Sequence, residues 1–161
     1  MKRLSLLIAL VGSIVLAVSC HTHTHTTQAT YATECQYLNH ESDGSITVRA
    51  YGQGRNRGDA LEQARKNAVE QVIFKGIYVP GNSSLSRPLV YEVNAREKYE
   101  DFFNTFFRDG GDFNSFVHGD DRRIGTNEKS WSGTQAKIST TVTVERGLLK
   151  QYLKEINIIK E

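Results

Sequence analysis

Two stretches of the chain alternate between hydrophobic and polar residues with the two-residue period of a β-strand. The first covers residues 46–51 and follows the turn-forming residues 42–44, and the second and longer one covers residues 136–145. Such alternation predicts strands with one buried face and one face open to water. The predicted buried positions are Ile46, Val48, Ala50, Ala136, Ile138, Thr140, Val142 and Val144.

The segment after the first strand predicts an amphipathic helix. A glycine-rich turn, residues 52–58, precedes Asp59, and Glu62 three residues later completes the pattern of a capping box. Gly76 is suited to the C-terminal end of this helix. Its apolar stripe is rich in alanine, which would let the helix lie close to a sheet. The stripe consists of Ala60, Leu61, Ala64, Ala68, Val69, Val72 and Ile73.

A second predicted helix is strongly aromatic. Asn94 and Glu97 repeat the capping-box pattern, and the paired glycines at 110–111 end the segment. Aromatic residues at helical spacing are typical of a core. Six of the seven phenylalanines nevertheless fall between residues 102 and 116, and we expect this block to contact a partner protein or a second copy of the chain. The predicted contact residues are Tyr99, Phe102, Phe103, Phe106, Phe107, Phe113 and Phe116.

The remaining elements complete a fold class. Residues 77–79 and 89–93 resemble short extended segments, and a last helix is expected after Gly147. One face of each predicted strand is polar, so helices are expected on the other face alone. The sequence therefore predicts one two-layer α+β domain over residues 35–161, with a mixed or antiparallel sheet.

The first 19 residues have the composition of a secretion signal. Lys2 and Arg3 precede an uncharged, mostly aliphatic stretch, residues 4–18, which is shorter than a membrane-spanning helix requires. Small residues at 17 and 19 also suit ordinary signal peptidase, with cleavage before Cys20. Residues 1–19 are therefore left out of the fold.

The end of this segment, Leu16-Ala17-Val18-Ser19-Cys20, resembles the lipobox of bacterial lipoproteins. The resemblance implies that Cys20 becomes the mature N-terminus and carries a diacylglycerol and an amide-linked acyl chain, such as palmitate. Several acyl chains anchor a protein firmly in a bilayer. Residue 21 is His rather than the Asp typical of inner-membrane retention, so the periplasmic face of the outer membrane is the expected location.

Residues 20–34 are expected to form a flexible tether because they are polar and contain no aliphatic cluster. His21, His23 and His25 are weak candidates for Zn²⁺, Cu²⁺ or Ni²⁺ binding. A flexible stretch lacks the supporting hydrogen bonds that make a metal site selective, so no metal is assigned. No cofactor is assigned to the chain either.

If Cys20 is acylated, Cys35 has no partner cysteine in its own chain. A small buried residue is the favoured interpretation, and an intermolecular disulfide is the alternative. Catalysis by this thiol would need a positioned base, and His40 and His118 have no recognisable protease context.

The glycine-rich turn also raises the question of a nucleotide. Its spacing, G-x-G-x-x-x-G, is one residue longer than the dinucleotide-binding pattern, and no clear acidic residue ends a second strand about 20 residues further on. The glycines are interpreted as allowing a sharp turn before the helix. Arg55 and Arg57 lie beside the predicted helix N-terminus and form a candidate anion-binding site.

The stretch 45–77 resembles a domain of small Gram-negative lipoproteins and the N-terminal module of the flagellar assembly protein T. The resemblance rests on the strand, Gly52-Gln53-Gly54, Asp59-Ala60 and the pattern Ala64-Arg65-x-x-Ala68, and it extends to the closing strand and helix. It implies a structural or assembly role in the cell envelope and supplies no catalytic residues.

Charge and motifs narrow the function further. The chain has 20 basic and 18 acidic residues, and removal of residues 1–19 leaves 18 of each sign, which argues against nucleic-acid binding. No common catalytic motif is present, and the charge run Asp120-Asp121-Arg122-Arg123 is typical of a solvated turn. We therefore expect a non-enzymatic envelope-binding or assembly protein, with a small-ligand or anion-binding protein as the alternative and a hydrolase as the less favoured one.

Overall fold

A computed structural model describes residues 35–119, 130–132 and 135–160. The described residues belong to one compact unit. Its strands are β1 (Gln36–His40), β2 (Ile46–Gly54), β3 (Val117–Gly119), β4 (Ser130–Ser132) and β5 (Gln135–Val144). Its helices are α2 (Arg57–Phe74), α3 (Ser83–Ser86), α4 (Ala95–Lys98), α5 (Glu100–Phe106), the 3₁₀ helix η1 (Asp112–Phe116) and α6 (Arg146–Glu155).

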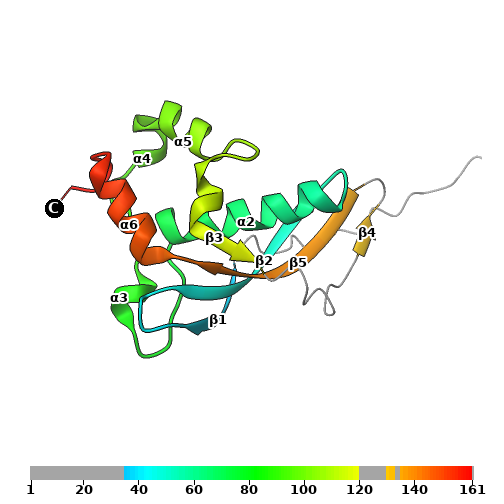
Figure 1. The fold of residues 1–161 in the computed structure, drawn as a ribbon, viewed down its shortest axis with the longest axis horizontal. Coiled ribbons are helices and arrows are strands. Elements are labelled where there is room, and N and C mark those ends of the chain that lie inside the picture. The colour runs from blue at the N-terminus through cyan, green and yellow to red at the C-terminus, as the bar shows by residue number, and fades with distance from the viewer. Residues whose placement is uncertain (1–34, 120–129, 133–134, 161) are drawn as a thin grey trace, which may run out of the picture. The chain divides into compact units, whose positions relative to one another are not determined.

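The strands form an antiparallel sheet in the order β1-β2-β5-β3, and β4 pairs with the other end of β5 (Figure 1). The two long strands run in register from Ile46 opposite Val144 to Gly54 opposite Ala136. The predicted α+β class is therefore present, with an antiparallel sheet. Strand β1 was not predicted, because its side chains are mostly exposed and carry little alternation.

One face of the sheet is buried beneath α2. Even-numbered residues of β2 and β5 point to this face, and Val48, Ala50 and Val144 are fully buried. Ala60, Ala64 and Ala68 of α2 are fully buried as well, as the alanine stripe predicted. Small side chains on the helix let its backbone approach the strands closely. In Figure 1, α2 runs along the sheet, with α4 and α5 beyond it.

The N-terminus of α2 differs from the prediction. Asn56, and not Asp59, is the N-cap: the Asn56 Oδ1 atom accepts a hydrogen bond from the Asp59 amide at 3.0 Å. The helix therefore begins three residues earlier than the Asp59/Glu62 pattern indicated. An asparagine cap is equivalent to an aspartate cap in this role, and the local sequence offers both.

The C-terminus of α2 is closed by glycine and by a distant loop. Gly76 has a φ of +79° and donates from its amide to the Gln71 carbonyl at 2.7 Å, as expected of a helix-ending glycine. Two further carbonyls at this end accept from Leu89 and Val90, whose amides lie 3.1 and 2.9 Å from the Val72 and Ile73 oxygens. The loop thus satisfies helix carbonyls that would otherwise lack partners.

The segments expected to extend as strands at 77–79 and 89–93 are irregular instead. Their apolar residues are nevertheless buried, since Ile77, Val79, Leu89 and Val90 belong to the main core. Hydrogen bonding to the end of α2, rather than to a neighbouring strand, occupies the Leu89 and Val90 amides.

The aromatic segment is two short helices rather than one. Asn94 has a left-handed backbone, with a φ of +61°, and its side chain makes no cap hydrogen bond, so the predicted Asn94/Glu97 capping box is absent. Tyr99 ends α4 and precedes α5. The last helix, α6, begins at Arg146, so Gly147 lies inside its first turn instead of preceding it.

Candidate functional site

Gly52 and Gly54 provide close contact between strand and helix. A Cβ atom on Gly52 would lie 2.0 Å from the Ala60 carbonyl oxygen, and one on Gly54 would lie 2.5 Å from the Asp59 Cβ. Neither glycine is among the residues with a positive φ. The interpretation that these glycines permit a sharp turn is therefore wrong. They leave room for the backbone of α2 against β2.

The candidate anion site at Arg55 and Arg57 lies at the exposed N-terminus of α2. The Arg55 Nε atom donates to Asp59 Oδ2 at 3.0 Å, in an ion pair in which the arginine side chain is 91% exposed. Asp59 therefore already places a carboxylate beside Arg55, and Asn56 occupies one free amide of the helix end. Arg57 is exposed. The structure brings the two arginines together at the N-terminal end of α2, where both are exposed.

The aromatic block is part of the hydrophobic core. Phe103, Phe106 and Phe113 are buried, and Tyr99, Phe102, Phe107 and Phe116 are partly buried and pack against the same core. The rings contact one another; for example, the centroids of Phe106 and Phe107 lie 4.9 Å apart in an edge-to-face arrangement. The three buried rings are occupied by the domain's own core, whereas Tyr99, Phe102, Phe107 and Phe116 stay partly exposed, so a partner contact through the block stays a prediction. The segment packs beside α2 and α6, where Phe103 contacts Phe74 and Phe106 contacts Tyr152.

Polar residues on one side of α2 hold this aromatic segment in place. Glu62, Lys66 and Glu70 are spaced four residues apart, so they form one row on the helix. Glu62 accepts from the Gly110 amide at 2.6 Å, Lys66 pairs with Asp109 at 2.5 Å, and Glu70 pairs with Arg96. Lys66 holds the pKa of the exposed Asp109 carboxyl below its usual range.

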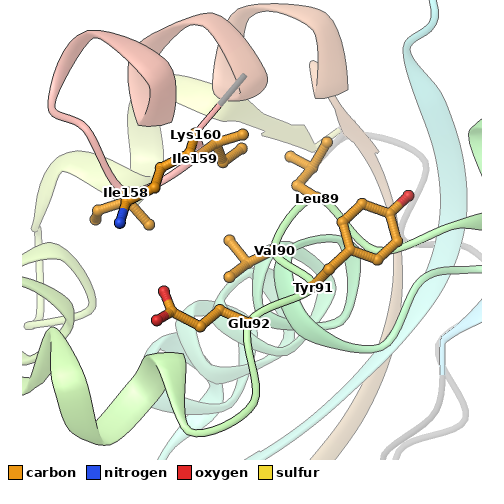
Figure 2. Close-up of a pocket in the computed structure, with 7 residues that line it drawn as sticks. All are labelled: Leu89, Val90, Tyr91, Glu92, Ile158, Ile159 and Lys160. Carbon is orange, nitrogen blue, oxygen red and sulfur yellow. The ribbon is translucent and has the colours of Figure 1, made fainter.

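A groove of about 240 Å³ lies between the segment after α3 and the C-terminal residues. Figure 2 shows the residues that line it: Val90 points into the space, and the Tyr91 ring points away from it. Tyr91 and the neighbouring Val93 are 66% and 83% exposed, so an apolar surface continues outside the groove. The lining consists of Leu89, Val90, Tyr91, Glu92, Ile158, Ile159 and Lys160.

The groove is lined by apolar side chains, with charged groups at its edge. Glu92 accepts a hydrogen bond from Lys98 at 2.5 Å, and this bond raises the pKa of the Lys98 ammonium group. Lys160 supplies a second cation. The lining contains no Ser, Thr, Cys or His that could serve as nucleophile or base beside a substrate.

The groove was not predicted because its two walls are far apart in the sequence. The left-handed backbone of Asn157, at a φ of +60°, ends α6 and turns the chain so that the Ile158 amide bonds to the Leu153 carbonyl at 3.0 Å. The only local signal was a pair of adjacent apolar residues at each site, Leu89-Val90 and Ile158-Ile159, outside the periodic segments.

Cys35 is a buried free thiol. Burial raises its pKa to about 12, and the nearby charge of Lys75 acts in the opposite direction. Its backbone amide donates to Gln71 Oε1 at 2.6 Å, which joins the start of β1 to α2. The favoured interpretation of a small buried residue agrees with this position.

The two histidines among the described residues have separate partners. The His40 Nδ1 atom shares a hydrogen bond of 2.7 Å with the Tyr37 hydroxyl, and His118 Nε2 lies 2.6 Å from Glu145 Oε1. In residues 35–119, 130–132 and 135–160, no group of three His, Cys, Asp or Glu side chains has metal-binding geometry. Cys20, His21, His23, His25 and the charge run at 120–123 lie outside the described residues.

Comparisons with known proteins give no relative. No protein-family model, curated protein or solved structure matches the chain. Among the helices of the described part of the chain, none is long and apolar enough to cross a bilayer.

Proposed function

We propose that the protein is a lipid-anchored, non-enzymatic binding or assembly module that faces the periplasm from the outer membrane. The observation that carries the proposal is the N-terminal sequence: two basic residues, an apolar stretch and Cys20 at its end. The similarity to small Gram-negative lipoproteins and to the flagellar assembly module supports an assembly role. A tether of 15 residues spans at most about 50 Å, so the partner lies near the membrane.

Metabolic labelling with a fatty acid tests this proposal directly. The wild-type protein is expected to take up label and to fractionate with outer membranes. Cys20→Ala is expected to lose the label and either enter the soluble periplasmic fraction or remain as the uncleaved precursor. Cys35→Ala, which removes the other cysteine, should label as the wild type does. An unlabelled, soluble wild-type protein would contradict the lipid anchor and would favour a disulfide between Cys20 and Cys35 instead.

A second candidate function, binding of a small apolar ligand, is supported by the groove of about 240 Å³ with its aliphatic walls. The fluorescent probe anilinonaphthalene sulfonate offers a direct test. Val90→Phe would fill the groove and is expected to reduce probe fluorescence several-fold, whereas Leu38→Phe on β1 adds the same ring elsewhere and should not. Equal fluorescence in wild type and Val90→Phe would remove this candidate.

A further inference from the structure

The side of the sheet opposite α2 is lined by polar side chains that are partly or fully exposed. We call this the open sheet face, and on the central strands it comprises Thr47, Arg49, Tyr51, Ser139, Thr141 and Thr143. The antiparallel register places Arg49 opposite Thr141 and Tyr51 opposite Ser139. The hydroxyl oxygens of Thr47 and Thr143 lie 2.9 Å apart, so these side chains point to the same side.

The charge of the open sheet face is of one sign along β2 and β5. The positions of these two strands that point to this face include Arg49 and Lys137 but no Asp or Glu. Arg49 makes no ion pair with any of the described residues, unlike Arg55 and Arg96, which pair with Asp59 and Glu70. A guanidinium that makes no ion pair within the described part of the chain can form charge-assisted hydrogen bonds with an external anion.

The hydroxyl groups of this face form a regular array. Neighbouring strands in a sheet are about 4.8 Å apart, and residues two apart on a strand are separated by about 6.8 Å. Hydroxyls on such a grid both donate and accept hydrogen bonds, as the hydroxyls of a sugar chain do. The Tyr51 ring adds an apolar surface with a polar tip beside Arg49, and the Asn67 side chain fixes its backbone by donating to the Tyr51 carbonyl at 2.8 Å.

We propose that the open sheet face binds a glycan chain that carries carboxylates. Arg49 pairs with a carboxylate, the Ser and Thr hydroxyls bond to sugar hydroxyls, and Tyr51 packs against a sugar ring. The inference rests on the proposed function in one respect, because a periplasmic location would give this face access to the glycan of the cell wall. The surface itself follows from the register of β2 and β5 and is independent of the anchor.

The test is isothermal titration calorimetry with the full chain in detergent. The probe is peptidoglycan glycan strands freed of their peptides, in which muramic acid carries a lactyl carboxylate. Neutral chitin oligosaccharides and glycerol 3-phosphate, the headgroup chemistry of an anionic phospholipid, are the comparison ligands. We expect binding to the carboxylated strands, with at least about tenfold weaker binding to either comparison ligand.

Two variants address the surface, and one matched variant serves as control. Arg49→Glu should raise the Kd for the carboxylated strands about tenfold or more, because it reverses the charge that pairs with the carboxylate. Thr141→Glu should have a similar effect, since the new carboxylate stands directly opposite Arg49 and pairs with it. Arg108→Glu makes the same charge change at an exposed position after α5 and should alter the Kd by less than about twofold.

Because Thr141 is exposed, Thr141→Glu is expected to fold, and it tests glycan binding at this face even if Arg49→Glu fails to fold. Wild-type affinity in Thr141→Glu, or an equal loss in Arg108→Glu, would overturn the proposal, and so would tighter binding of glycerol 3-phosphate. Failure of the anchor proposal changes fatty-acid labelling and fractionation and leaves this titration unaffected, so the two failures are distinguishable.

Discussion

Gly52 of β2 lies against the backbone of Ala60 in α2, so close that a Cβ atom on the glycine would be 2.0 Å from the Ala60 carbonyl oxygen. The same atom would be 2.5 Å from the Ala64 amide nitrogen. Because both contacts are with backbone, no side-chain rotation relieves them. The spacing of glycines that resembles a nucleotide-binding turn thus serves helix–sheet packing.

Gly52→Ala is accordingly expected to lower the free energy of unfolding by about 2–3 kcal/mol, since the helix must move away from the strand. Urea denaturation measures this change. Gly81→Ala is the control: Gly81 has a φ of +74°, and a Cβ atom added there would meet nothing within 4 Å, so its cost is conformational only and about 1–2 kcal/mol. A smaller cost for Gly52→Ala than for Gly81→Ala would contradict the packing role.

Phe106→Ala is expected to lower the free energy of unfolding by about 3–5 kcal/mol, because Phe106 is 1% exposed and contacts several other rings. Tyr91→Ala, at a side chain 66% exposed, should change it by less than about 0.5 kcal/mol. Thermal and urea unfolding distinguish the two. An unchanged free energy of unfolding in Phe106→Ala would contradict the buried position of this ring.

Cys35 gives a pH-dependent prediction. Its folded-state pKa of about 12 lies above the ordinary value of 9.0, so the folded state retains the thiol proton that the unfolded state loses first. The associated stability is complete below pH 9 and is lost as the pH rises toward 12. Over this pH range, the unfolding free energy of the wild type should therefore fall relative to that of Cys35→Ala, by up to about 1.4 kcal/mol per pH unit.

Thiol reactivity provides an independent measurement at neutral pH. With Cys20 acylated or replaced by Ala, Cys35 should react with Ellman's reagent only after the chain is unfolded in urea, because the nucleophile is the thiolate and burial suppresses it. Rapid labelling of the folded protein would contradict the buried position and revive the intermolecular disulfide.

Arg146 connects the start of α6 to the loop around α3. Its Nη2 atom donates to the Ser84 and Arg87 carbonyls at 3.2 and 3.1 Å, and burial lowers the pKa of its guanidinium. Arg146→Ala is expected to cost about 1–3 kcal/mol and to increase proteolysis of residues 82–88, because two carbonyls lose their donor. Arg57→Ala, an exposed arginine, should cost less than about 0.5 kcal/mol.

Limited proteolysis followed by mass spectrometry locates the cleavage. The buried Arg146 Nε atom has no hydrogen-bond partner among the described residues, so Arg146→Met keeps the apolar stem and removes this cost. It should therefore be less destabilising than Arg146→Ala. The reverse order would show that packing of the stem is unimportant.

The sequence by itself determined those elements in which the local pattern of apolar and polar residues matches the pattern of buried and exposed positions. Alternation at 46–51 and 136–144 predicted β2 and β5, because burial of one sheet face imposes a period of two, and the alanine stripe and Gly76 predicted the body and end of α2. The burial of Cys35 was also predicted from the sequence. Each of these predictions depends on the residue types of one continuous segment, and the α+β class follows from the predicted elements taken together.

Tertiary structure decided everything that depends on segments distant in the sequence. Three rings of the aromatic block are buried because the segment packs against the core beside α2, with contacts at Glu62, Lys66 and Glu70, and the amphipathic pattern of one helix cannot reveal what covers it. The groove exists because the turn at Asn157 brings the C-terminal residues to a loop that closes the end of α2. Contacts between segments that are distant in the sequence form only in the folded chain. Local residue preferences do not reveal them, because each contact depends on how the other segments are packed.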